Sequence, residues 1–337
     1  MKHYICIILF FLFSNYSFGQ DPHFSQFFSA PHLNNPALAG TQYGDWAVMA
    51  NIRQQWGNAS TPFNTQALAG ECKINNGSGG ENYFAIGSML MNDQTMNGAF
   101  RSNYANASFA YHRKLSHNHR IAAGFHGSYA NRRLDYSRLQ FGSQFDGSGF
   151  DVAIPAGETG LSSMKPFFSL GAGILYTLEQ NEGDFLMDIG YASFDINRPN
   201  QSFLKDPNNQ LNIRHVGYFN LQSYQTNDLY YQISSIFHYQ ALQNYFAIGG
   251  SLGLSLANEF EKMFLVGCWF REGDAIYPYT AFRFKGFQVG LNYDITLSKQ
   301  NLGPSNPRTF ELSLILTGKY PKSNYYDCPF KNRYVRF

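Results

Sequence analysis

The stretch from residue 287 to 298 alternates strictly between apolar side chains and small or polar ones. Its apolar positions are Phe287, Val289, Leu291, Tyr293, Ile295 and Leu297. Because successive side chains of a β-strand point to opposite faces, this pattern predicts a strand with one apolar and one polar face. Such a strand suits a barrel wall whose apolar face meets lipid and whose polar face meets the lumen.

Fourteen segments read as strands when period-2 patterning is followed between turn signals. Their approximate bounds are 43–53, 62–72, 83–92, 99–112, 120–130, 167–178, 184–193, 211–222, 229–239, 245–257, 263–271, 275–285, 286–298 and 308–320. In lipid, only a closed sheet pairs every strand edge. The sequence therefore predicts an all-β protein, a transmembrane outer-membrane β-barrel of about 14 antiparallel strands. A soluble β-sandwich or propeller would not need the lipid-facing bands.

The connections between these segments differ in length in a regular way. The two longest, 131–166 and 194–210, are the fifth and seventh, whereas the even-numbered connections are short. If both chain termini are periplasmic, the odd-numbered connections face the cell exterior. Long loops outside and short turns inside are typical of outer-membrane barrels.

The chain begins with the features of a secretory signal. Lys2 provides a positive charge, residues 5–13 form an apolar run too short to span a bilayer, and residues 17–19 form a small-x-small cleavage site. We expect a signal peptide at 1–19 and a mature chain that starts at Gln20. Three further parts are expected: an N-terminal plug or periplasmic segment, the barrel, and a periplasmic tail, at 20–40, 41–320 and 321–337 respectively. The alternative for the tail, which ends in an aromatic residue, is a final strand.

The composition agrees with a membrane wall. Only 14% of the residues are charged and 17% are aromatic, whereas a soluble domain has about 25% charged residues. Tyrosine and phenylalanine supply the aromatic girdles of such barrels. Cleavage of the signal lowers the net charge from +2 to +1, and nothing in this balance indicates nucleic-acid binding.

Several motifs along the mature chain resemble the PorP/SprF family, outer-membrane components associated with the type IX secretion system of Bacteroidetes. They are Gln20-Asp21-Pro22-His23-Phe24-Ser25-Gln26-Phe27, Asn35-Pro36-Ala37-Leu38-Ala39-Gly40, Arg53-Gln54-Gln55-Trp56, Gly290 to Ser298, Phe310-Glu311-Leu312-Ser313-Leu314 and Cys328-Pro329-Phe330. These motifs extend from the start to the end of the mature chain and follow one another in the same order as in the family. Phe310 departs from the pattern, since the family often has His before the Glu.

The resemblance implies a barrel that binds or anchors a secreted surface adhesin, through the C-terminal domain of that adhesin, or another type IX translocon subunit. Some family members serve adhesins of gliding motility and surface attachment. The alternative function is an outer-membrane pore or transporter for small or hydrophobic compounds. We expect no enzymatic activity and no cofactor, with outer-membrane lipid as the surroundings of the wall.

Residues 20–40 contain three prolines, which cannot donate to a central ladder, so this segment is not an ordinary strand. The region around Asn35 resembles the short N-terminal plug of fatty-acid transporter barrels of the FadL type. A plug in the lumen would bury the segment's Phe and Leu side chains; the alternative is a disordered periplasmic leader. In a scaffold, this segment and the long loops would carry partner binding. The candidate partner-binding residues are Asp21, Pro22, His23, Phe24, Gln26, Phe27, Asn35 and Pro36.

A charge group is expected where the barrel closes. Arg53 lies near the outer end of the first strand, Glu311 near the same end of the last, and Asp294 at similar height on the neighbouring strand. The first and last strands of a closed barrel must meet. Two carboxylates in a narrow lumen need a cation, and the fork of an arginine suits that role.

Three cysteines, Cys72, Cys268 and Cys328, follow the signal. An odd number in an oxidising compartment permits at most one bridge. Cys72 ends the second strand on the periplasmic side and Cys328 lies in the tail, so we expect a disulfide between them. The alternative is three free thiols.

Three other sets of residues contain types that occur in catalytic or metal sites, but a structural role explains each set better. His126 and Ser128 have lumenal parity, so they do not meet lipid as a phospholipase pair would. Around His112, His117 and His119, interleaved basic residues oppose a metal. Asp146, Asp151 and Glu158 lack the ordered ligand spacing of a calcium loop. We therefore expect no catalytic or metal site.

Overall fold

The structure is a computed structural model that describes residues 22–59, 61–75, 82–151, 153–155, 163–180, 184–204, 206–225, 229–256, 262–297 and 308–320. The predicted signal peptide (1–19) and periplasmic tail (321–337) lie outside these ranges and stay predictions. Among the residues within them, no helix is both long enough and apolar enough to cross a membrane.

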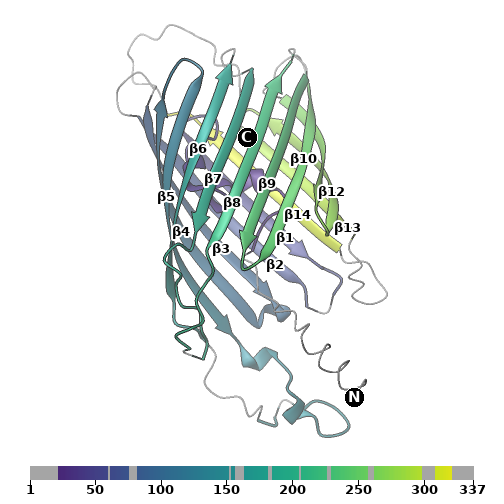
Figure 1. Ribbon diagram of the computed structural model, residues 1–337. Helices are drawn as coiled ribbons and strands as arrows, with labels where there is room; N and C mark the ends of the chain where they lie inside the picture. Colours follow the sequence, from purple (N-terminus) through teal and green to yellow (C-terminus); the bar gives the residue numbers. More distant parts are fainter. Residues whose placement is uncertain are drawn as a thin grey trace, which may run out of the picture.

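Fourteen antiparallel strands form the wall (Figure 1). They are β1 (Trp46–Gln55), β2 (Phe63–Asn75), β3 (Tyr83–Thr95), β4 (Phe100–Lys114), β5 (His119–Leu134), β6 (Phe167–Gln180), β7 (Phe185–Phe194), β8 (Arg214–Tyr224), β9 (Leu229–Gln240), β10 (Gln243–Ser255), β11 (Lys262–Arg271), β12 (Ala275–Phe284), β13 (Phe287–Thr296) and β14 (Arg308–Gly318). Each strand pairs with its sequence neighbours, and β1 also pairs with β14. The sheet is therefore closed, and the predicted all-β barrel of 14 strands is confirmed.

The strand ends lie within a few residues of the predicted ones. The first strand begins at Trp46 rather than at 43, because Gly44 has a left-handed φ of +85° that interrupts the extended backbone. Six short 3-10 turns accompany the strands in the described part of the chain: η1 (Phe27–Ser29), η2 (Pro31–Leu33), η3 (Pro36–Leu38), η4 (Met96–Gly98), η5 (Tyr136–Arg138) and η6 (Gly142–Gln144).

The two faces of the wall follow the predicted parity. On β13 the side chains of Gln288, Asn292 and Asp294 are buried toward the lumen. The apolar positions between them include Leu291, Tyr293 and Ile295, which are exposed on the outer surface. The same alternation appears on β6 and β14. The strands contain 10 to 16 residues, long enough for tilted strands to cross a bilayer.

The connections divide between the two ends of the barrel. The odd-numbered connections, including 135–166 and 195–213, lie at one end, here called the long-loop mouth. The even-numbered connections lie at the other end, the short-turn mouth. The tightest of them is the two-residue turn Lys285–Gly286, whose φ values of 45° and 82° match the twist of a hairpin.

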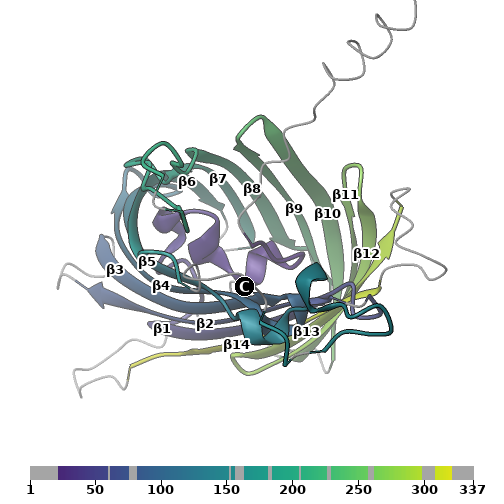
Figure 2. The same ribbon diagram turned by 90° about the horizontal axis from the view of Figure 1, so that it is seen from below.

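The interior of the barrel contains residues 22–42, here called the lumen segment. In the view along the barrel, this purple segment lies inside the ring of strands (Figure 2). Every residue from Phe24 to Gln42 except Leu33 is buried. Its three 3-10 turns, η1 to η3, keep it compact, and Pro31 and Pro36 each occupy a first helical position, where the missing N–H costs no hydrogen bond.

A first prediction concerns the lipid face of the wall. Ile174 on β6 is 62% exposed on the outer surface, and Leu242, in the turn between β9 and β10, is 77% exposed. Ile174→Arg should lower the free energy of unfolding by about 2–4 kcal/mol because a charge enters the hydrocarbon, whereas Leu242→Arg near the interface should cost about 0–1 kcal/mol. Denaturant unfolding in lipid vesicles measures both. Equal stability of the two variants would contradict the assignment of the faces.

Candidate functional site

The charged residues expected at barrel closure lie together in the lumen. Arg53 and Glu311 are direct cross-strand partners where β1 meets β14. Arg53 Nη2 lies 3.5 Å from Asp294 Oδ2, and Arg53 Nη1 lies 3.8 Å from Glu311 Oε2. The exposed fraction of each of the three side chains is 2% or less. This charge group is therefore shielded from both lipid and bulk water.

Two further members of the charge group were not predicted from the sequence. Arg271, the last residue of β11, donates from Nη2 to Asp294 Oδ2 at 2.5 Å. Ser25 Oγ donates to the Asp294 carboxylate at 3.0 Å and accepts from Arg53 Nη1 and Arg271 Nη1, each at 3.1 Å. The lumenal parity of Arg271 at the same end of the barrel was the available signal. No sequence signal indicated Ser25, because its partners depend on the path of residues 22–42 through the lumen.

Glu311 binds the backbone of the lumen segment as well as Arg53. Its two carboxylate oxygens accept from the N–H of Ser25 and the N–H of Gln26, each at 2.8 Å. The Gln26 side chain donates from Nε2 to Asn292 Oδ1 at 2.8 Å, and its Oε1 accepts from Ser313 Oγ at 2.5 Å. The wall thus recognises the segment through its backbone and one amide side chain.

Two buried arginines, Arg53 and Arg271, face the two buried carboxylates of Asp294 and Glu311 in the lumen. Arg271 also donates to Asp274, a carboxylate that is 43% exposed, at 2.7 Å. Buried charges are tolerable only when they are paired and hydrogen-bonded. The lumen segment supplies the remaining donors through Ser25 and Gln26. A barrel without the segment would leave Glu311 without those two N–H groups.

A set of wall glycines makes room for the middle of the segment. A Cβ on Gly124 would overlap the backbone of Pro36 and Ala37, and one on Gly173 would overlap Asn35 Oδ1. The same holds for His32 at Gly87. Glycine in a strand marks close approach by another part of the chain. We call Gly87, Gly124 and Gly173 the glycine cradle, because a side chain at any of these positions would occupy the space of the lumen segment.

Asn35 fastens the segment to the cradle. Its side-chain amide donates to the carbonyl of Ile174 at 2.9 Å, while its Oδ1 accepts from the N–H of Ala37 at 2.8 Å. The second contact caps η3, as asparagine commonly does at an N-cap. Asn35 therefore shapes the segment and binds the wall with one side chain.

The end of the segment is held near the short-turn mouth. His112 Nε2 lies 2.8 Å from the carbonyl oxygen of Ala39, and its ring stacks on Tyr83 at a centroid distance of 4.4 Å. Tyr83 donates to the carbonyl of Gly40 at 3.1 Å, and Lys73 donates to that of Gln42 at 2.8 Å. Closer to its middle, the segment's His32 pairs with Glu71 at 3.3 Å.

The candidate partner-binding residues lie inside the barrel rather than on its surface. Phe24, Gln26, Phe27, Asn35 and Pro36 are buried, and Pro22 and His23 are partly buried. Asp21 lies outside the described residues. The buried five contact the chain's own wall in this arrangement, so a partner could reach them only after the segment moves.

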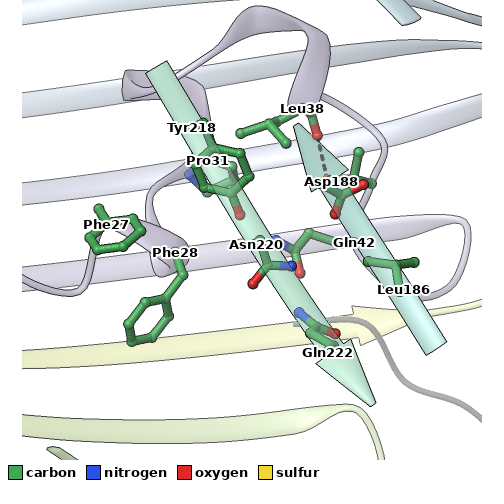
Figure 3. Close-up of a pocket in the computed structure, with 11 residues that line it drawn as sticks. Phe27, Phe28, Pro31, Leu38, Gln42, Leu186, Asp188, Tyr218, Asn220 and Gln222 are labelled. Atoms are coloured by element: carbon green, nitrogen blue, oxygen red, sulfur yellow. Dashed lines mark hydrogen bonds between the residues drawn. The ribbon is translucent and has the colours of Figure 1, made fainter. Parts of the chain in front are cut away.

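The space left beside the segment is small. One cavity lies between the segment and strands β7 and β8, lined by aromatic residues such as Phe28 and Tyr218 and by polar ones such as Asp188 and Asn220 (Figure 3). Its volume is about 20 Å³, close to that of one water site. A second cavity of about 50 Å³, lined by Pro22 and Arg214 among others, lies toward the long-loop mouth. Both are far below the ~300 Å³ of a typical ligand pocket.

The histidines considered for chemistry have different surroundings. His126 faces the lumen, where its Nδ1 is 3.3 Å from Ser108 Oγ and its ring meets Phe194 edge-on. His112 binds the lumen segment, His117 is exposed in a turn, and His119 is 2.6 Å from the Tyr176 hydroxyl. In the part of the chain that the structure describes, no group of three such side chains is placed to hold a metal ion.

The acidic residues of the longest loop bind their own backbone. Asp146 accepts from the N–H groups of Ser148 and Gly149 at 2.8 and 2.9 Å. These hydrogen bonds favour the ionised form and lower the pKa of Asp146. Asp151 similarly accepts from the N–H of Ala153. Glu158 lies outside the described residues.

The predicted disulfide involves a residue outside the described ranges. Cys72 is half-buried, and its thiol forms no disulfide with another cysteine of the described residues. Cys268 is exposed on the outer face of β11. Cys328 lies beyond residue 320, so its pairing with Cys72 stays a prediction.

Comparisons with known proteins agree on the kind of molecule. The family model described as "Type IX secretion system membrane protein PorP/SprF" matches residues 16–316. No curated protein sequence matches the chain. The solved structure of the TodX deltaS2S3 mutant monoaromatic hydrocarbon channel is 8% identical, with a TM-score of 0.50, over 85% of this chain and 92% of that one.

Two other solved barrels are similar to a lesser degree. A Pseudomonas aeruginosa FadL homologue is 10% identical, with a TM-score of 0.46, over 86% of this chain and 94% of that one. The KdgM porin in complex with disordered oligogalacturonate is 8% identical, with a TM-score of 0.41, over 80% of this chain and 98% of that one. At such identities, the likeness to the TodX channel shows the fold alone.

A second prediction tests the glycine cradle with two positions on one strand. A Cβ on Gly124 meets the lumen segment, whereas one on Gly127, on the lipid-facing side of β5, meets nothing within 4 Å. Gly124→Leu should displace residues 35–37 and open the lumen, so ion conductance in planar bilayers should rise above that of the wild type. Gly127→Leu should leave it unchanged. A closed Gly124→Leu barrel would contradict the cradle.

A third prediction tests the charge group. Glu311→Gln removes a buried ionic partner of Arg53, which should lower the free energy of unfolding by about 3–5 kcal/mol. Glu272→Gln, in an exposed turn, is the matched control and should have little effect. Arg53→Met combined with Glu311→Gln should cost less than the sum of the single losses, because the residues interact. Strictly additive losses in denaturant unfolding would rule out the coupling.

Proposed function

Because the chain belongs to the PorP/SprF family of type IX secretion system membrane proteins, we propose that it is an outer-membrane scaffold of that system. In this role it binds or anchors a secreted surface adhesin, through that protein's C-terminal domain, or another translocon subunit. The proposed role is not enzymatic. The protein would hold its partner on the surface of a rigid, closed wall.

One observation carries this proposal: the lumen is occupied by the chain's own residues. Backbone groups of Ser25 and Gln26 are bound by Glu311, and Asn35 is bound to the carbonyl of Ile174. These contacts are buried, and the two cavities beside them hold about 20 and 50 Å³. A barrel filled in this way supports a binding role more than a flow of solutes.

The partner would meet the long-loop mouth, which we place on the cell exterior. The connection 135–166 includes a compact part in which Gln144 binds the N–H of Phe141 and the carbonyl of Ile154. At its tip, the rings of Phe145 and Phe150 lie 5.3 Å apart and are 52% and 50% exposed. Exposed, pre-ordered aromatic side chains are common anchors of protein interfaces.

The alternative is a pore or transporter for small or hydrophobic compounds. It would require the lumen segment to leave the charge group and the cradle, since both cavities are too small for such a ligand. Mass spectrometry of the complex extracted from native membranes in mild detergent separates the two roles. Co-purification of a protein that carries a type IX secretion signal, or of a translocon subunit, supports the scaffold. A lumenal lipid or hydrocarbon without such a protein supports the transporter.

A fourth prediction asks whether the lumen segment takes part in this role. Removal of Asp21 to Gly40 should abolish surface retention of the partner while the barrel still enters the membrane, as measured by surface proteolysis and by heat-modifiable mobility of the barrel. The matched control replaces the exposed Glu272 by Gln and should retain the partner. Normal retention by a deleted barrel that assembles would remove the segment from the mechanism.

A further inference from the structure

The outer face of β2 to β5 changes from apolar to polar toward the long-loop mouth. These four strands lie side by side in the wall (Figure 1). Direct cross-strand partners form an apolar row across their outer face: Leu68, Leu90, Ala105 and Tyr129. The next row toward the mouth, the amide row, contains Gln66, Asn92, Asn103 and Asn131. The row beyond it, the arginine row, contains Asn64, Gln94, Arg101 and Arg133.

The order of these rows indicates their depth in the membrane. Residues two apart on a strand share a face, and consecutive rows are about 7 Å apart along the strand. Leu90 in the apolar row is 62% exposed, as a side chain that meets hydrocarbon should be, whereas amides are costly in hydrocarbon. The amide row therefore marks the edge of the hydrocarbon on the long-loop side. The arginine row then lies at the level of the lipid headgroups.

Arg101 and Arg133 are direct cross-strand partners on this outer face. Like charges in that position destabilise a sheet. Among the residues that the structure describes, neither arginine forms an ion pair with a carboxylate. Arg101 Nε donates to the carbonyl of Gly98 at 2.9 Å, which orients its guanidinium. An anion bound by both arginines would remove their repulsion.

Two adjoining grooves cover this part of the outer face. One, of about 510 Å³, is lined by both arginines and by Asp135, whose carboxylate is already bound by Arg138 Nε at 3.1 Å and by the Ser137 hydroxyl at 2.6 Å. The other, of about 600 Å³, is lined by the apolar row. Asn92 and Asn103 line both grooves. Each volume lies within the roughly 300–1,000 Å³ typical of ligand sites.

We propose that this outer face binds one anionic lipid, with its phosphate between Arg101 and Arg133 and its acyl chains on the apolar row. Guanidinium groups bind phosphate oxygens through charge-assisted and often bidentate hydrogen bonds. Asn92 and Asn103 lie between the two parts of the site, at the level of the polar linkage that joins the phosphate of such a lipid to its chains. The site is separate from the lumen, and it does not rest on the proposed function.

Binding of defined lipids to the purified barrel in detergent tests the site. Phosphatidic acid should bind in native mass spectrometry and raise the midpoint of thermal unfolding, whereas diacylglycerol with the same chains should bind far more weakly. Arg101→Gln combined with Arg133→Gln should weaken binding of phosphatidic acid about tenfold or more. Arg113→Gln is the matched control, because Arg113 is exposed on the same face of β4 near the short-turn mouth. It should bind as the wild type does.

The double variant lacks the repulsion between the two arginines, so without lipid it should unfold at the midpoint of the wild type or higher. That readout separates loss of binding from failure to fold. Equal binding of phosphatidic acid by the double variant, or of diacylglycerol by the wild type, overturns the site. So does an equal loss in Arg113→Gln, which would show attraction by surface charge in general. Displacement of the lipid by inorganic phosphate alone would indicate a free-phosphate site and overturn the lipid.

Photo-crosslinking in the native membrane tests the site with both arginines in place. Benzoylphenylalanine in place of Asn103, which lines both grooves, should form adducts enriched in anionic lipid. Benzoylphenylalanine in place of Phe264, which is 44% exposed on the outer face of β11, reports the bulk lipid. The same lipid composition at both positions overturns the site. Adducts at position 103 with protein instead of lipid would assign this face to a protein interface and overturn it as well.

Discussion

The rest of the structure depends on the neutralisation of buried charge at barrel closure. Arg53, Arg271, Asp294 and Glu311 meet in a lumen that excludes bulk water, and Ser25 and Gln26 add hydrogen bonds to this group. Unpaired, such groups would carry a large desolvation penalty. The wall and the lumen segment are therefore parts of one interior, and neither has its full set of hydrogen bonds without the other.

The same contacts hold together the first and last strands, β1 and β14, whose pairing closes the barrel. Arg53 belongs to β1 and Glu311 to β14, and the lumen segment binds both. Stability of the closed sheet is thus coupled to occupation of its lumen, while the cradle at Gly124 and Gly173 fixes the path of the chain. A filled interior also leaves the loops as the surfaces most accessible to a partner, which is consistent with a scaffold of the type IX system.

The wall was predictable from the sequence because period-2 alternation is local. In residues 287–298 the alternation alone indicates which side chains face lipid and which face the lumen, whatever strand lies beside them. Parity and height also predicted that Arg53, Asp294 and Glu311 would be near one another. Arg271 was missed although its parity and its end of the barrel matched those of Asp294, two strands away. Ser25 was missed because its contacts depend on the direction of the lumen segment. Prolines and 3-10 turns at 27–38 have no periodicity that would reveal that direction.

Amide hydrogen exchange of the purified barrel, resolved to Ser25 and Gln26, tests the central claim most directly. Both N–H groups donate to the buried carboxylate of Glu311, so they should exchange as slowly as the paired amides of β13 and β14, which open only with the barrel. Exchange of these two amides at the rate of an unprotected peptide, beside protected strands, would show that residues 22–42 form a loose leader and would contradict the account.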